Sequence, residues 1–136
     1  LRMLPLRIWN GRALIYLYRP KALARDLACE DAACLLNGSG YDGTEPSGCL
    51  RCLMDRLQCQ KDGFPHEIGL FLGYPPEDVE GFRLHRGRDY KLSGCWKVYG
   101  DVEQAQHLFR RYAACRKRYL AMASSGLTLG EMLAAG

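Results

Sequence analysis

Residues 64–82, FPHEIGLFLGYPPEDVEGF, constrain the fold more than any other stretch, because an apolar run ends there at a glycine and two prolines. The run predicts a buried β-strand over residues 67–72. Pro76 predicts the first position of a short helix, whose first turn carries Glu77 and Asp78, where acids suit the positive end of the helix dipole. A second central strand is expected over residues 94–99, before the longest helix.

Asn10-Gly11 is the strongest two-residue signal for a β-hairpin, here over residues 3–19. A two-residue loop predicts a register that places apolar residues opposite one another on one face. The predicted pairs are Ile8 with Ala13, Leu6 with Ile15, and Leu4 with Leu17. Pro5 lacks a backbone N–H, so the first strand is expected to be an edge strand.

Helices are expected over residues 21–36, with a break near Glu30, and over residues 48–60, capped by Ser47. The longest begins after Asp101, with Gln104 three residues on as in a capping box, and Thr128 caps a short last helix over residues 129–134. The long helix should bury one apolar stripe: Val102, Ala105, Phe109, Tyr112, Tyr119 and Leu120. Together the elements predict an α+β fold, a mixed sheet of about four strands packed by helices, in one domain over residues 1–136.

Composition indicates an ordinary globular protein. The 136 residues are 48% hydrophobic and 25% charged, with 19 Lys and Arg against 15 Asp and Glu and a net charge of +4. This balance favours solvated basic faces over a nucleic-acid interface, so we expect no specific nucleic-acid partner. No apolar run approaches a membrane span, so we expect no membrane partner. Seven cysteines, an odd number, predict reduced thiols and a cytoplasmic protein.

Cys49 and Cys52 have the spacing of half a zinc site, with Cys59 as a third candidate ligand. On one helix, however, Cys52 and Cys59 would be separated by about 10 Å along the axis, too far to bind one ion. We therefore expect incidental thiols and no metal. The sequence does not identify a cofactor.

His66 and Glu67 enter the predicted strand at residues 67–72. His66 is the candidate general base, and the alternative is a structural histidine bonded at the strand entry. Adjacent strand residues point to opposite faces, so the two side chains are not expected to share one site. We favour the structural interpretation.

The candidate ligand-binding surface is the end of the predicted sheet, where the loops after both central strands would meet. Its residues are Tyr74, Glu77, Asp78, Lys91 and Tyr99.

Three stretches, FPHEIGLFLGYPPEDVEGF, RGRDYKLSGCWKVYGD and LFRRYAAC, together resemble a family of uncharacterised proteins of anaerobic Firmicutes, defined as a domain of unknown function. The hairpin LPLRIWNGRALIYLYRP is similar to the same family, so the resemblance covers nearly the whole chain. It implies a bacterial cytosolic protein without an established activity. It also implies that full-length relatives carry a further N-terminal segment with a cysteine, which this chain is expected to lack.

Residues 66–73, HEIGLFLG, are also similar to the strand that carries the catalytic histidine in cell-wall amidases of the papain-like superfamily. The resemblance implies a thiol hydrolase or transferase with His66 as base. Its nucleophilic cysteine would lie upstream of Leu1. His66 is shifted by one residue from the usual spacing, which in a strand would turn it to the opposite face.

The leading hypothesis is thus a small bacterial domain that binds a small molecule or a protein and performs no covalent chemistry. The thiol hydrolase is the alternative. A third hypothesis is a basic module for RNA or DNA that uses Arg83, Arg86, Arg88 and the cluster at Arg116.

Overall fold

The computed structural model describes residues 1–59 and 64–135. Two compact units make up the chain, Leu1–Tyr90 and Lys91–Gly136, and each is described by itself. Helices and strands are both present, as an α+β protein requires, but the strands form two separate two-stranded sheets instead of one mixed sheet of four. The prediction of a single domain stays a prediction.

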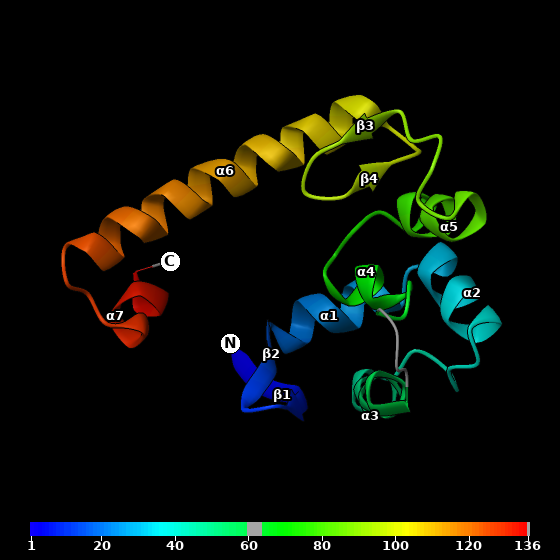
Figure 1. Ribbon diagram of the computed structural model, residues 1–136, viewed down its shortest axis with the longest axis horizontal. Helices are drawn as coiled ribbons and strands as arrows, with labels where there is room; N and C mark the ends of the chain where they lie inside the picture. Colours follow the sequence, from blue (N-terminus) through cyan, green and yellow to red (C-terminus); the bar gives the residue numbers. More distant parts are fainter. Residues whose placement is uncertain (60–63, 136) are drawn as a thin grey trace. The chain divides into compact units, whose positions relative to one another are not determined.

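Unit 1 begins with the predicted hairpin, made by β1 (Arg2–Trp9) and β2 (Arg12–Tyr18) (Figure 1). The predicted pair Ile8 with Ala13 is present. Beyond it a bulge between Pro5 and Arg7 shifts the register by one residue, so that Pro5 faces Ile15. A bulge adds one residue to one strand and reverses which side chains share a face. The other two predicted pairs, of Leu6 and Leu4, are therefore wrong.

The buried face of the hairpin consequently differs from the predicted one. Leu6 and Tyr16 are buried, whereas Ile8 is 73% exposed. The Tyr16 ring stacks on Tyr18, with ring centroids 5.1 Å apart. The face that carries the tyrosines is therefore the one that packs on the core.

Three helices follow: α1 (Pro20–Leu27), α2 (Glu30–Gly38) and α3 (Pro46–Cys59). The break near Glu30 is confirmed. The predicted cap of α3 is wrong, since the Glu45 carboxylate accepts the hydrogen bond from the Gly48 amide at 2.8 Å, while Ser47 lies inside the helix. The buried side of α3 carries Cys49, Leu50, Leu53 and Leu57.

Residues 67–72 do not form the predicted strand. They contain a short helix, α4 (Ile68–Phe71), which ends at Gly73 with φ +75°. The Tyr74 amide donates to the Gly69 carbonyl at 2.9 Å and the Gly73 amide to the Leu70 carbonyl at 3.1 Å, which is a Schellman ending. A short apolar run fits a buried helix as well as a buried strand, so periodicity could not separate the two.

Helix α5 (Pro76–His85) starts as predicted, with Pro76 in its first turn beside Glu77 and Asp78. Gly69 allows α4 and α5 to approach closely, because a Cβ at Gly69 would lie 2.7 Å from Cγ2 of Val79. The approach fixes the segment around His66 against α5.

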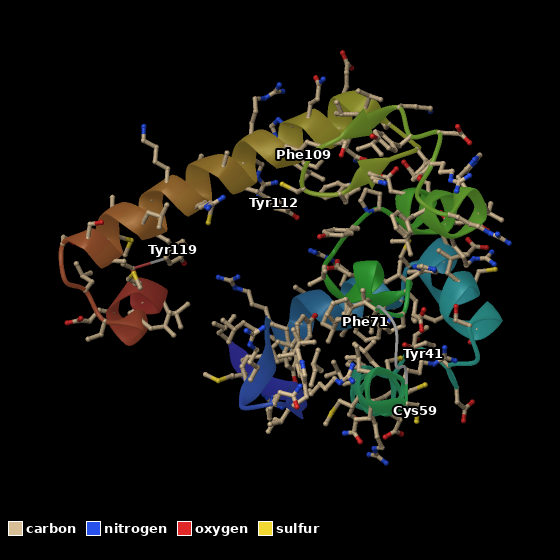
Figure 2. All side chains as sticks on the ribbon, in the orientation of Figure 1. Tyr41, Cys59, Phe71, Phe109, Tyr112 and Tyr119 are labelled. Carbon is tan, nitrogen blue, oxygen red and sulfur yellow. The ribbon has the colours of Figure 1, made fainter. Side chains whose placement is uncertain are left out.

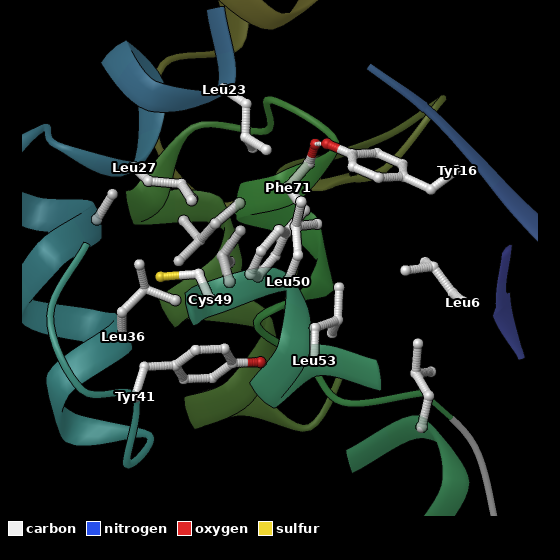
Figure 3. Close-up of a cluster of buried hydrophobic side chains, with 14 residues drawn as sticks. Leu6, Tyr16, Leu23, Leu27, Leu36, Tyr41, Cys49, Leu50, Leu53 and Phe71 are labelled. Atoms are coloured by element: carbon white, nitrogen blue, oxygen red, sulfur yellow. Dashed lines mark hydrogen bonds between the residues drawn. The ribbon is translucent and has the colours of Figure 1, made fainter. Parts of the chain in front are cut away.

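One hydrophobic cluster forms the core of unit 1 and draws on β1, β2 and α1–α5 (Figure 3). Leu27, Leu36, Leu53 and Leu57 are completely buried within it. The Tyr16 hydroxyl donates to the Phe71 carbonyl and so ties the hairpin to α4. The buried environment and the nearby Tyr18 raise the pKa of Tyr16 to about 12.

Unit 2 contains a short hairpin, β3 (Leu92–Ser93) and β4 (Lys97–Val98), followed by α6 (Val102–Ser124) and α7 (Leu129–Ala134). Of the strand predicted over residues 94–99, Lys97–Val98 is present as β4, whereas the start is wrong, because the Gly94 amide donates to the Trp96 carbonyl at 3.0 Å in a tight turn. Both helix starts are confirmed. Asp101 accepts from the Gln104 amide at 3.0 Å, and Thr128 and Glu131 form a complete capping box.

The predicted buried stripe of α6 is mostly wrong. Ala105 is the buried residue of this helix, while Tyr112 is 39% and Leu120 58% exposed. The β3–β4 hairpin covers the start of the stripe, where Trp96 packs edge-on against Phe109 at 4.6 Å. Phe109, Tyr112 and Tyr119 lie on one side of α6 (Figure 2).

Candidate functional site

A buried carboxylate lies at the junction of α3, α4 and the loop after α2. Glu67 is 9% exposed and precedes α4 directly. Its Oε1 accepts hydrogen bonds from Arg56 Nη1 and from the Tyr41 hydroxyl, each at 3.1 Å. Burying a carboxylate without such donors would cost several kcal/mol of folding free energy. The hydrogen bonds from Arg56 and Tyr41 offset this cost for Glu67.

Arg56 itself is held from three sides. Besides its bond to Glu67, its Nη2 donates to the Ser39 carbonyl, and its guanidinium lies 4.9 Å from the centre of the Tyr41 ring. Burial raises the pKa of Tyr41 well above its ordinary value, and the charge of Glu67 raises it further. Tyr41 therefore stays protonated near neutral pH and remains a hydrogen-bond donor to Glu67.

A cavity of about 310 Å³ opens beside this network, lined by Arg56, Cys59, Pro65, His66 and Glu67. The His66 side chain is exposed, and its ring rests on Phe82 of α5 with centroids 5.3 Å apart. The arrangement offers N–H donors and a thiol around a hollow whose wall contains an ion pair. That volume is at the lower end of the range of small-molecule sites.

The expectation that His66 and Glu67 cannot share one site is wrong, since both line this cavity. The expectation rested on strand alternation, and the segment turns as a short helix instead. The resemblance to the amidases concerned a strand. Residues 68–71 form a short helix, so no strand corresponds to it at this place. A catalytic role for His66 stays a prediction.

The five predicted ligand-binding residues are divided between the two units. Glu77 is exposed and lines a separate depression of about 270 Å³ with Asp31, Cys34 and Glu80. Asp78, next to it, is only 2% exposed, and Tyr74 is half-buried.

The remaining two, Lys91 and Tyr99, belong to unit 2. The Lys91 ammonium donates to the Gly100 carbonyl at 2.9 Å, at the end of the β3–β4 hairpin. A shared surface of all five residues stays a prediction.

The cysteines of α3 have different environments. Cys49 is buried, its Sγ lies 3.4 Å from the Gly43 carbonyl, and burial raises the pKa of its thiol. Cys59 is exposed at the end of the same helix. Within residues 1–59 and 64–135, no three His, Cys, Asp or Glu side chains are arranged to hold a metal ion.

The sequence did not predict that Arg56 and Cys59 line the cavity, or that Tyr41 donates to Glu67 in its wall. In the sequence Arg56 lies between Leu53 and Leu57, which are buried on α3. A cation so close to a buried face indicates a buried acidic partner. No local signal marked Tyr41, because its partner Glu67 is 26 residues away.

Fold and site together define an α+β protein with a helical core unit that carries a small polar cavity and a second unit built on one long helix. In the described part of the chain, no helix combines the length and the apolar character needed to cross a bilayer. Over residues 1–133 the chain matches the family described as protein of unknown function DUF3793, and it belongs to that family. No curated protein and no solved structure shows significant similarity to it.

Proposed function

We propose that the protein binds a small anionic molecule without covalent chemistry, in the cavity lined by Arg56, Cys59, Pro65, His66 and Glu67. The observation that carries the proposal is the preorganised ion pair in the cavity wall. Arg56 is fixed by Glu67, Ser39 and Tyr41 before any ligand arrives. A donor held in place loses little conformational freedom when it binds, and this preserves affinity.

The chemistry of the wall selects the ligand class. Arg56 has five N–H donors, some of which bond to Glu67, Ser39 and Cys52, and its side chain is 36% exposed. His66 adds a ring N–H at the same cavity. A carboxylate or phosphate group can accept from both side chains, and charge-assisted bonds of this kind are the strong ones. The buried Glu67 already accepts from Tyr41 and Arg56, so it competes little with the ligand for the remaining N–H donors.

The proposal includes a bacterial cytoplasmic setting. The odd number of cysteines, seven, and the exposed Cys59 at the cavity support it. A reducing compartment keeps such thiols from forming disulfides.

Thermal unfolding of the full chain in the presence of inorganic phosphate, acetate and a panel of small carboxylates and phosphate monoesters tests the proposal. A ligand that binds only the folded state raises the unfolding midpoint, and the increase grows with the logarithm of the ligand concentration above Kd. We expect at least one compound to do so, and His66→Ala, which removes the ring N–H, to weaken its binding by about tenfold, the loss of one charge-assisted bond. His107→Ala, at an exposed histidine of α6, is the matched control and should leave binding unchanged.

Two outcomes contradict the proposal. One is that no carboxylate or phosphate raises the midpoint at millimolar concentration. The other is that His66→Ala and His107→Ala have the same effect on binding.

A further inference from the structure

The net charge of the protein resides entirely in unit 2. Unit 1, Leu1–Tyr90, has 12 Lys and Arg and 12 Asp and Glu, whereas unit 2, Lys91–Gly136, has seven against three and a net charge of +4. No acidic residue occurs from Gln104 to Gly130, a stretch that contains five Lys and Arg. Such segregation produces a local positive field that a net charge of +4 over the whole chain conceals.

We call the "basic arm" the part of α6 from Arg110 onward together with α7, residues 110–135. Its cations share a face of α6, because Arg110, Arg111, Lys117 and Arg118 recur at spacings of seven residues. None of the ion pairs at Arg25, Arg56, Arg83 and His85 involves a residue of the arm. The cations of the arm therefore remain available to an anionic partner.

The arm has one acid, Glu131, against five cations, so its net charge stays positive. Glu131 accepts hydrogen bonds from the amide and the hydroxyl of Thr128, at 2.8 and 2.7 Å, and these bonds lower its pKa. Arg118 donates to the Ala135 carbonyl at 2.7 Å and so ties α6 to the end of α7. The arm is a helical hairpin with a fixed positive face.

Large apolar side chains are exposed beside this charge. The most exposed are Leu120 at 58% and Leu129 at 51%, and the full set is Tyr112, Leu120, Leu127, Leu129 and Leu133. On α6, Tyr112 lies on the side opposite Arg110 and Leu120 on the side opposite Arg111, with Arg116 between them. Apolar and cationic side chains of the arm thus border one another along both edges of the helix.

We infer that the basic arm docks on an anionic lipid surface, with its apolar side chains at the boundary of the acyl chains and its cations at the headgroups. A helix with this division of side chains lies in the plane of a membrane interface. Each Lys or Arg near an anionic surface adds to the attraction, and the arginine stems can extend along the interface. Tyrosines such as Tyr112 and Tyr119 suit the headgroup region, because their rings are apolar at one end and polar at the other.

Charge complementarity selects this occupant over two others. A second copy of the arm would bring five more cations against the first five with only one acid, Glu131, in each copy, which is repulsive. Nucleic acid would satisfy the cations but would leave the exposed leucines in water. A lipid surface accepts both kinds of side chain and needs no matching groove.

Co-sedimentation of the full chain with vesicles tests the inference. We expect binding to vesicles of phosphatidylcholine with half phosphatidylglycerol, weak binding to pure phosphatidylcholine, and a strong reduction in 0.5 M salt. The triple variant Arg110→Gln, Arg111→Gln, Lys117→Gln should bind the anionic vesicles at least about tenfold more weakly. The matched control removes three exposed cations of unit 1, Arg12→Gln, Lys21→Gln and Arg51→Gln, and should bind as the unchanged protein does.

A second variant, Leu120→Ser with Leu129→Ser, tests the contribution of the apolar side chains to vesicle binding. It should also bind anionic vesicles more weakly, while its circular dichroism spectrum stays that of the unchanged protein. The inference is overturned if the chain does not bind anionic vesicles, or if it binds both kinds of vesicle alike. It is equally overturned if polyglutamate or RNA binds as tightly as the vesicles and the leucine variant leaves all binding unchanged, which would indicate an acidic protein or a nucleic acid instead.

Discussion

The two units differ in how much of their apolar surface they bury internally. Unit 1 gathers residues from a hairpin and five helices into one cluster (Figure 3), in which Leu27, Leu36, Leu53 and Leu57 are completely buried. In unit 2 the buried apolar residues are Trp96, Val98 and Ala105, which lie around the start of α6. The same helix-forming pattern thus produces a core in one unit and an exposed stripe in the other. Amphipathicity predicts a helix but does not provide the surface that covers it.

The units also differ in how they use charge. In unit 1 a cation, Arg56, is paired with the buried Glu67 and fixed beside a cavity. In unit 2 the cations of α6 are exposed and lie within residues 104–130, a stretch that contains no Asp or Glu. Paired charges position groups within a fold, whereas unpaired charges of one sign attract a partner from outside.

The largest expected effect is loss of the unit 1 core. Leu53→Ala removes a completely buried side chain and should lower the free energy of unfolding by about 2–5 kcal/mol. Leu120→Ala, at a residue 58% exposed on α6, is the matched control and should change it by at most about 0.5 kcal/mol. Chemical denaturation of both variants measures the difference. Equal losses would show that the stripe of α6 is covered in solution, and the contrast between the units would disappear.

A smaller effect is expected where unit 2 does have a core. A Cβ at Gly94 would collide with the Phe109 ring, so Gly94→Ala should separate the β3–β4 hairpin from α6 at a cost of about 1–3 kcal/mol. Hydrogen exchange should accelerate over residues 92–112 and remain unchanged in unit 1. The control Gly130→Ala lies in α7 with no neighbour within 4 Å and should stabilise that helix slightly. Faster exchange throughout unit 1 in the Gly94 variant would contradict the division into units.

The smallest effect concerns the hydroxyl that ties the hairpin of unit 1 to α4. Tyr16 has a pKa of about 12 in the folded protein and 10.0 in the unfolded chain. Because the folded-state pKa is the higher one, the contribution of this hydroxyl is complete below pH 10 and is lost as the pH rises through 12. Tyr16→Phe should therefore cost about 1 kcal/mol at neutral pH. It should also reduce the fall in stability between pH 10 and 12.

Tyr112→Phe, at an exposed ring of unit 2, is the control for this measurement and should leave the pH dependence as it is. The comparison requires urea denaturation at several pH values between 8 and 12. Identical slopes for both variants would mean that the bond from Tyr16 to the Phe71 carbonyl does not hold the hairpin in solution.

The sequence by itself determined the features that depend on neighbours along the chain. Asn10-Gly11 marked the hairpin, Pro76 the start of α5, and Asp101 and Thr128 the starts of α6 and α7. Each of these signals acts within about one turn, through a fixed φ angle or a side chain that bonds a nearby amide, so no distant residue can override it easily.

Only the tertiary structure decided which surfaces the elements bury. The bulge at Leu6 reversed the faces of the hairpin, and the run Ile68–Phe71 became a helix because it packs into the core as one, with Gly69 against Val79. The cavity followed from the same packing, since Glu67 finds Arg56 and Tyr41 only after α3 and α4 meet. These outcomes depend on contacts between residues far apart in the chain. The free energy of such contacts exceeds local conformational preferences, and the contacts produce no pattern in any short stretch of sequence.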